Sequence, residues 1–184
     1  MRIRRLACAA AVLASMASGC ASTPTSYYTL DMRPSAQAEP DGLAFRHVVL
    51  SDTLAGMGLP ILSTPTTMEY YEGAQWTGSL EDIVREKFQS EFGGVTVSQA
   101  KYVLDGHVIA FAQRDLPGGA AEAYAKIELM VRDSGESRYA APLMARIYEH
   151  AEPMEAATPA HLAAALSRCI ERIAAMARAD AAAL

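Results

Sequence analysis

The segment Ala121-Glu-Ala-Tyr-Ala-Lys-Ile-Glu-Leu-Met-Val-Arg132 alternates small or apolar side chains with polar ones. Successive side chains of a β-strand point to opposite faces of the sheet, so this alternation predicts a strand with one buried and one solvated face. Turn signals flank it, Leu-Pro-Gly-Gly at 116–119 and Asp-Ser-Gly at 133–135. Further strand-like runs lie beyond them, at 101–113 and 139–150. The sequence therefore predicts an antiparallel meander. Its buried face carries Ala123, Ala125, Ile127, Leu129 and Val131, and its solvated face carries Glu122, Tyr124, Lys126, Glu128 and Arg132.

Two amphipathic helices are predicted on either side of this meander. The first follows Ser79, a capping residue with Asp82 three positions later, and ends at Gly93-Gly94. Its apolar stripe consists of Leu80, Ile83, Val84, Phe88 and Phe92. The second begins at Thr158-Pro159, a cap followed by proline at the first helical position. Its inner face carries Leu162, Leu166, Cys169, Ile170, Ile173 and Ala177, which predicts that Cys169 packs in the core as a small hydrophobic residue.

The remaining strands are predicted from β-prone runs. They lie at 27–30, 45–50 and 66–71, with an extended proline-bracketed segment at 59–65 and a short strand at 95–98. Strands, a helix, a meander and a second helix in this order predict an α+β sandwich. We expect one domain, with a mostly antiparallel sheet and the two main helices packed on one face. The sequence contains no internal repeat.

The N-terminus has the features of a bacterial lipoprotein signal. Arg2, Arg4 and Arg5 precede an apolar run at 6–16, and Ala17-Ser18-Gly19-Cys20 follows. The apolar run is shorter than a membrane-spanning helix requires. We therefore predict removal of residues 1–19 and lipidation of Cys20 with diacylglycerol and a palmitate-type acyl chain. An ordinary signal peptide, with Cys20 as an incidental thiol, is the alternative.

The predicted signal sets the boundaries of the mature protein. Residues 20–26 are polar and form a flexible tether, and residues 27–178 form the folded domain. Removing the three signal arginines leaves 13 basic and 21 acidic residues, a net charge of −8. This charge argues against a nucleic-acid partner and against electrostatic docking on anionic lipid headgroups. Cys169 is then the remaining cysteine besides Cys20, so no disulfide framework is expected.

No catalytic constellation stands out. The histidines at 47, 107, 150 and 161 form no His-x-His or His-x-x-x-His pair, and we expect neither a metal nor another cofactor. Asp105 and His107 lie on one strand face, where a general-base pair is conceivable, although a surface or interface pair is the favoured interpretation. The sequence also lacks a Gly-x-Ser-x-Gly elbow and a phosphate-binding loop. We therefore predict that the protein is not an enzyme.

Aromatic residues gather in the first half of the chain. They are Tyr27, Tyr28, Tyr70, Tyr71 and Trp76. In one interpretation they line an acyl-chain groove or a protein interface. In the other, they alternate between the core and its rim. For Trp76, directly before the first helix, burial is expected. The tyrosines leave both interpretations open.

An ordered set of motifs resembles the ABC-type transport auxiliary lipoproteins, the PqiC-like group. After the lipobox come Tyr28-Thr29-Leu30, Leu59-Pro60-Ile61-Leu62, Trp76 before a capped helix, and the strand 102–108 that leads to Phe111. A hairpin and a C-terminal helix complete the pattern over residues 27–178. The chain departs from the family pattern at Ser63-Thr64, where relatives often carry Asp-Arg.

The resemblance implies a non-catalytic role in lipid transport across the envelope. The protein would be a lipoprotein of the outer membrane, anchored by its N-terminal lipid, on the periplasmic face. Its partners would be an MCE-domain protein and the transporter complex, and a homo-oligomer stays open. A scaffold or assembly lipoprotein of another envelope machine is the alternative, and a periplasmic hydrolase is a third. From the residues themselves, we expect the partner surface on the polar sheet face, around Asp105, His107, Tyr124 and Lys126.

Overall fold

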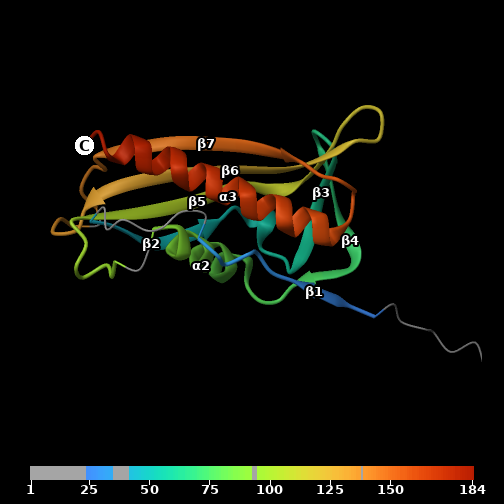
Figure 1. Ribbon diagram of the computed structural model, residues 1–184, viewed down its shortest axis with the longest axis horizontal. Coiled ribbons are helices and arrows are strands. Elements are labelled where there is room, and N and C mark those ends of the chain that lie inside the picture. The colour runs from blue at the N-terminus through green and yellow to red at the C-terminus, as the bar shows by residue number, and fades with distance from the viewer. Residues whose placement is uncertain (1–23, 35–41, 93–94, 138) are drawn as a thin grey trace, which may run out of the picture.

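A computed structural model describes residues 24–34, 42–92, 95–137 and 139–184. Within these ranges the chain forms one seven-stranded sheet and two α-helices, which confirms the predicted α+β class (Figure 1). In chain order the elements are β1 Ser26–Tyr28, β2 Leu43–Leu50, the 3-10 turn η2 Asp52–Leu54, β3 Gly58–Thr64, β4 Thr67–Trp76, α2 Leu80–Phe92, β5 Tyr102–Asp115, β6 Ala121–Asp133, β7 Met144–Pro153 and α3 Pro159–Ala181.

The predicted meander forms the larger part of the sheet. β5, β6 and β7 pair antiparallel in sequence order, with Leu104 opposite Val131 and Ile127 opposite Tyr148. The apolar face of β6 is fully covered: Ala123, Ala125, Ile127, Leu129 and Val131 are each 0% exposed. This agreement follows from the strict two-residue period, since a shift of one residue would turn every apolar side chain of β6 to solvent.

Parallel pairings, which the sequence did not indicate, occur in the other half of the sheet. β2 pairs with the first part of β5, with Val48 opposite Gly106, and β3 pairs with its last part, with Ile61 opposite Gln113. Both strands thus use the same edge of β5, one after the other, with η2 between them. β1 also runs parallel to its neighbour β4.

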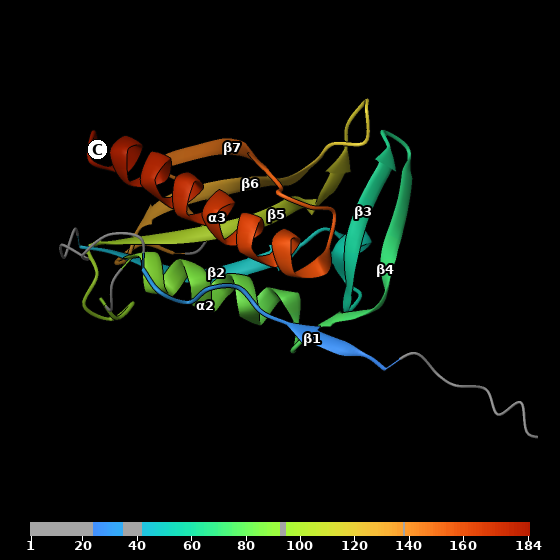
Figure 2. The same cartoon turned by 45° about the vertical axis from the view of Figure 1, so that its right-hand side comes forward.

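β3 and β4 form an antiparallel hairpin that stands at an angle to the meander (Figure 2). The strand predicted at 66–71 is too short, because β4 continues to Trp76. Gly73 has φ of 65°, a conformation that glycine adopts without steric cost, and the strand resumes beyond it. The continuation brings Gln75 between Tyr27 of β1 and Gly58 of β3.

Two other boundary predictions also differ from the structure. Residues 95–98 do not form a strand: the Thr96 carbonyl accepts hydrogen bonds from the Gln99 and Ala100 amides, which closes a local turn. β7 begins at Met144 rather than at residue 139, and it extends to Pro153. In both places the local composition suits a strand, but residues 96–100 bond within their own turn, and the β7 ladder with β6 starts only at Met144, opposite Val131.

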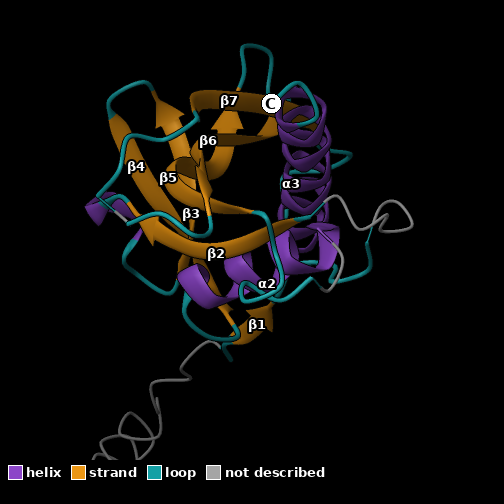
Figure 3. Ribbon diagram, turned by 90° about the vertical axis from the view of Figure 1, so that its left-hand side faces the viewer, coloured by secondary structure: helices purple, strands orange, loops and turns teal. Residues whose placement is uncertain are grey.

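Both helices cover the apolar face of the sheet. Viewed end-on, the sheet curves, with α3 along one side and α2 next to it by β2 (Figure 3). Phe88 of α2 stacks on Phe45 of β2 with ring centroids 4.7 Å apart. Cys169 and Trp76 are each 0% exposed, as predicted. Thr158 caps α3 by accepting a hydrogen bond from the His161 amide. Among the described residues, no helix combines the length and the apolar character needed to cross a membrane.

Candidate functional site

The helix-free face of the sheet brings the predicted surface residues onto one side. Opposed residues of an antiparallel pair share a face, and Lys126 lies opposite Ala110 while Tyr124 lies opposite Ala112. His107 lies opposite Glu128 and Asp105 opposite Met130 on the same face. We call this side of β2, β5, β6 and β7 the outer face. Asp105, His107, Lys126 and Tyr124 follow one another along it, and all four side chains are partly exposed.

Two arginines surround the carboxylate of Asp105. Arg46 of β2 bonds to it through two nitrogens, and the Arg132 Nε lies 3.8 Å from the Asp105 Oδ2. His107 instead contacts Ser51 Oγ, at 3.2 Å from its Nε2, and Glu128, at 3.9 Å from its Nδ1. The structure therefore pairs Asp105 with arginines rather than with His107. The conceivable general-base pair does not form.

Tyr124 and Lys126 meet at a carboxylate of the edge strand. The Tyr124 hydroxyl donates to Glu149 Oε2 at 2.7 Å, and the Lys126 Nζ lies 3.4 Å from the same atom. The guanidinium of Arg114 stacks over the Tyr124 ring, 4.3 Å from its centroid. Partial burial, with the Glu149 hydrogen bond, raises the pKa of Tyr124 to about 12. The same hydrogen bond, together with Lys126, lowers the pKa of Glu149.

A cleft of about 670 Å³ opens beside Tyr124 at one end of the outer face. One wall is the end of β3 and its turn, and the other is the end of β5 and its turn. The lining is mostly apolar and includes Leu62, Pro65, Arg114, Leu116, Pro117 and Tyr124. A groove with apolar walls and an arginine at its edge suits an amphipathic ligand or a protruding side chain of a partner.

The described part of the chain holds no group of three or more His, Cys, Asp or Glu side chains placed to bind a metal ion. Burial raises the pKa of the Cys169 thiol to about 12, so this cysteine stays protonated and unreactive at neutral pH. Its Sγ contacts the Ala123 carbonyl at 3.6 Å. Cys20, the predicted lipidation site, lies outside the described residues.

The tyrosines divide as an alternating pattern predicts. Tyr28 and Tyr71 are half-buried against the core, whereas Tyr27 and Tyr70 are 60% and 50% exposed. Trp76 is a packing residue next to Phe111, with ring centroids 6.1 Å apart. None of these aromatic side chains lines the cleft beside Tyr124.

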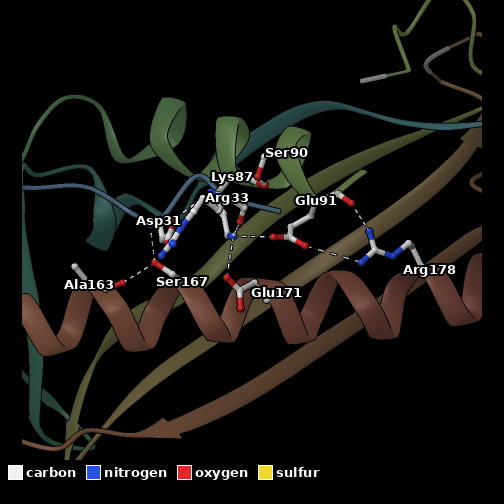
Figure 4. Close-up of polar contacts among 9 residues, drawn as sticks. All are labelled: Asp31, Arg33, Lys87, Ser90, Glu91, Ala163, Ser167, Glu171 and Arg178. Carbon is white, nitrogen blue, oxygen red and sulfur yellow. Dashed lines mark hydrogen bonds and ion pairs between the residues drawn. The ribbon is translucent and has the colours of Figure 1, made fainter. Parts of the chain in front are cut away.

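A buried polar cluster between the two helices was missed in the sequence (Figure 4). The Lys87 ammonium is 0% exposed and donates to Glu91 Oε1 at 2.7 Å and to Glu171 Oε1 at 3.0 Å. Arg178 of α3 lies 3.9 Å from Glu91 Oε2. Two cations thus face two carboxylates, as buried charges require. The i,i+4 spacing of Lys87 and Glu91 was visible in the sequence, but it is equally typical of a solvated helix face.

The cluster also holds the segment that follows β1. Lys87 Nζ donates to the Arg33 carbonyl at 2.8 Å, and the Asp31 amide donates to Ser167 Oγ at 2.9 Å (Figure 4). Leu30, between β1 and these contacts, is 2% exposed. Hydrogen bonds with α2 and α3 therefore hold the first described segment, residues 24–34, against both helices, although its sequence is largely polar.

Comparison with known proteins identifies the family. The family model described as "ABC-type transport auxiliary lipoprotein component" matches residues 28–177. The chain belongs to this family. The match runs from the last residue of β1 to Ala177 in α3, and it includes the outer face, the cleft and all of the buried cluster except Arg178.

Solved structures support the fold of this transport auxiliary lipoprotein. Protein XCC0632 from Xanthomonas campestris, of the DUF330 family, is similar with a TM-score of 0.67 at 16% identity, over 83% of this chain and 92% of that one. An uncharacterized protein is similar with a TM-score of 0.61 at 16% identity, over 86% of this chain and 99% of that one. At these identities the likeness concerns the fold alone. No curated protein matches the chain.

Proposed function

We propose that this auxiliary lipoprotein is a non-catalytic component of an ABC/MCE-type lipid transport system that maintains the cell envelope. The family match over residues 28–177 carries the proposal. The N-terminal signal pattern adds an anchor on the periplasmic face of the outer membrane. The outer face, with its cleft, adds a surface on which an MCE-domain partner would dock. The protein would act by binding and positioning, since no described group has the arrangement of a catalytic site.

The anchor is the part of the proposal that is simplest to test. Cys20 follows Gly19 at the predicted cleavage point, and its thiolate would accept the diacylglycerol. Acyl chains contribute about 0.8 kcal/mol per buried methylene, and stable anchoring requires more than one chain. We expect Cys20→Ser to release the protein from membranes or leave it unprocessed. Mass spectrometry of the mature N-terminus should show an acylated Cys20, and an unmodified Ala or Ser start would contradict the anchor.

The residue after Cys20 indicates whether the lipoprotein is sorted to the inner or the outer membrane. Ala21 stands where an aspartate would signal retention in the inner membrane of enterobacteria. We therefore expect the outer membrane, with the domain in the periplasm. Fractionation of envelopes on a sucrose gradient should place the protein with outer-membrane markers. Cofractionation with inner-membrane markers would contradict this location.

The docking surface is tested by changing the outer face without disturbing the core. Lys126→Glu with Tyr124→Ala reverses a charge and removes a ring, yet both side chains are partly exposed. We expect this double variant to fold and to be lipidated but to lose copurification with an MCE-domain partner. A matched control makes the same two kinds of change elsewhere, with Arg168→Glu on α3 and Tyr139→Ala before β7.

The outcomes separate the two candidate functions. If the double variant still binds the MCE-domain partner and fully complements a deletion strain, the docking surface is not on the outer face. If the wild type recovers no such partner from detergent-solubilised envelopes, the scaffold alternative replaces the transport role. Size-exclusion chromatography of the wild type in the same detergent reports whether the protein forms a homo-oligomer.

A further inference from the structure

We propose that exposed side chains around the start of β1 form a membrane-resting surface, which fixes the orientation of the domain on the phospholipid bilayer. The surface consists of Tyr27, Tyr70 and Met57, and we call it the tyrosine patch. This inference rests on the proposed lipid anchor at Cys20. Beyond that anchor, the inference specifies which side of the domain faces the membrane.

Strand pairing brings the patch together from β1, β4 and the residue before β3. Tyr27 of β1 and Gly58 of β3 both lie opposite Gln75 of β4, one on each side of it. The Tyr70 ring lies over Gly58, since a Cβ added there would come within 2.8 Å of Tyr70 Cδ1. Met57 precedes Gly58, and its carbonyl accepts a hydrogen bond from the Trp76 amide. The three patch side chains are thus on adjacent segments.

Each of the three side chains is largely exposed. Tyr27 is 60%, Tyr70 50% and Met57 46% exposed. The Tyr70 hydroxyl donates to the Thr53 carbonyl at 3.3 Å. Tyrosine prefers the boundary between hydrocarbon and water, because its ring is apolar and its hydroxyl is polar.

The length of the tether places this patch near the lipid. Six residue steps separate Cys20 from Ser26, which span at most about 20 Å when fully extended. α3, by comparison, has 23 residues and is about 35 Å long. The start of β1 must therefore stay close to the bilayer, whereas the turn between β6 and β7 lies at the opposite end of the molecule (Figure 1).

The tether also makes a small patch sufficient. Three side chains do not hold a free protein on a membrane, but a short flexible linker gives an effective concentration in the millimolar range. Electrostatic attraction to anionic lipid does not contribute to this contact. The mature chain carries a net charge of −8, and Glu69 and Glu72 are exposed near Tyr70. The contact is therefore expected to be apolar and insensitive to salt.

The attachment of the segment after β1 couples β1 rigidly to the rest of the domain. Lys87 and Ser167 hold residues 31 and 33 against both helices, so β1 does not swing away from the domain. An anchor that pulls on Ser26 consequently acts on the whole domain at one fixed point. Contact of the tyrosine patch with the bilayer would then limit the rotation of the whole domain about its linker.

Fluorescence quenching by labelled lipids tests the orientation. The full lipidated protein, with a fluorophore on Gly56→Cys, is reconstituted in phosphatidylethanolamine and phosphatidylglycerol vesicles that contain nitroxide-labelled lipid. Gly56 adjoins the patch, and a Cβ added there meets no atom within 4 Å. Native Cys169 is buried and Cys20 is acylated, so the label is specific. The control label is Glu136→Cys in the exposed turn after β6.

We expect strong quenching at Gly56→Cys and little at Glu136→Cys, in both low and high salt. Tyr27→Ser with Tyr70→Ser should remove the difference between the two labels while acylation and membrane fractionation persist. Tyr139→Ser is the matched control, because Tyr139 is 80% exposed but lies outside the patch, and it should preserve the difference.

Three results would overturn the inference. Equal quenching of both labels would show that the domain has no preferred orientation. Absence of quenching at labelled Gly56→Cys, together with a disulfide-linked dimer when the unlabelled Gly56→Cys protein is oxidised with a copper–phenanthroline reagent, would show that a second copy covers the patch. A protein without acyl chains on Cys20 would refute the anchor, and with it the inference, whereas the other two results leave the proposed transport role intact.

Discussion

Replacement of Lys87 by methionine tests whether the buried cluster holds the N-terminal segment and the two helices together. Lys87 is 0% exposed and donates to Glu91, Glu171 and the Arg33 carbonyl at 2.7 to 3.0 Å. Methionine fills a similar volume but leaves the buried Glu91 carboxylate without its nearest cation. Loss of one partner of a buried ion pair costs about 3 to 5 kcal/mol.

The groups around Glu91 and Glu171 reduce the expected loss of unfolding free energy. Arg178 lies 3.9 Å from Glu91 Oε2 and compensates part of the charge, and the Glu171 side chain is 26% exposed and retains some water. We therefore expect the lower end, about 3 kcal/mol, which is a large share of the 5 to 15 kcal/mol typical of a domain. With an m-value of about 2 kcal/mol per molar urea, the midpoint falls by about 1.5 M.

Urea unfolding followed by circular dichroism, on the chain that begins at Ala21, measures the loss. Lys87→Met with Glu91→Met should recover most of it, because an apolar pair of similar size replaces the ion pair at little cost. Arg85→Met is the matched control, since Arg85 pairs with Asp82 on the exposed side of the same helix and should lose at most about 1 kcal/mol.

Hydrogen exchange adds a local measurement. The Asp31 amide donates to Ser167 Oγ next to the cluster, so its exchange should accelerate in Lys87→Met more than that of the Ile127 amide in β6. A Lys87→Met protein as stable as Arg85→Met, with unchanged exchange at Asp31, would refute the role assigned to the cluster.

Three further predictions concern the core and the outer face. Phe88→Ala should cost about 3 to 5 kcal/mol of unfolding free energy in urea, because Phe88 is 0% exposed and stacks on Phe45; a loss below about 1 kcal/mol would show a tolerant core. The folded state raises the pKa of Cys169 to about 12 from 9.0, so above pH 9 the unfolded chain releases a proton that the folded chain keeps, and stability falls as pH rises. Cys169→Ala should remove about 1.4 kcal/mol of the stability loss between pH 8 and 10, and an unchanged pH profile would contradict burial of the thiol. Tyr124→Phe removes the main hydrogen bond that lowers the pKa of Glu149, so this pKa should rise in a carboxyl NMR titration, and a constant value would exclude the contact.

The sequence alone determined the strands and helices that show a regular spacing of apolar side chains within one segment. The alternation at 121–132 gave β6 and its buried face, and the apolar stripes gave α2 and α3 with Phe88 and Cys169 inside. The same two-residue period placed Asp105, His107, Tyr124 and Lys126 on one face, because alternation decides sidedness before any partner strand is known. The ordered motifs from Tyr28 to the C-terminal helix identified the family.

Only the tertiary structure decided which strands meet and which charges are buried. β2 and β3 share one edge of β5, a parallel arrangement that depends on contacts some 50 to 60 residues apart rather than on local pattern. Lys87 is buried because Glu171, 84 residues further along the chain, reaches it. Asp105 bonds to Arg46 rather than to His107 for the same reason. The spacing of apolar side chains is set within one segment of the chain. Strand pairing and the burial of a charged side chain depend instead on which other segments pack around it.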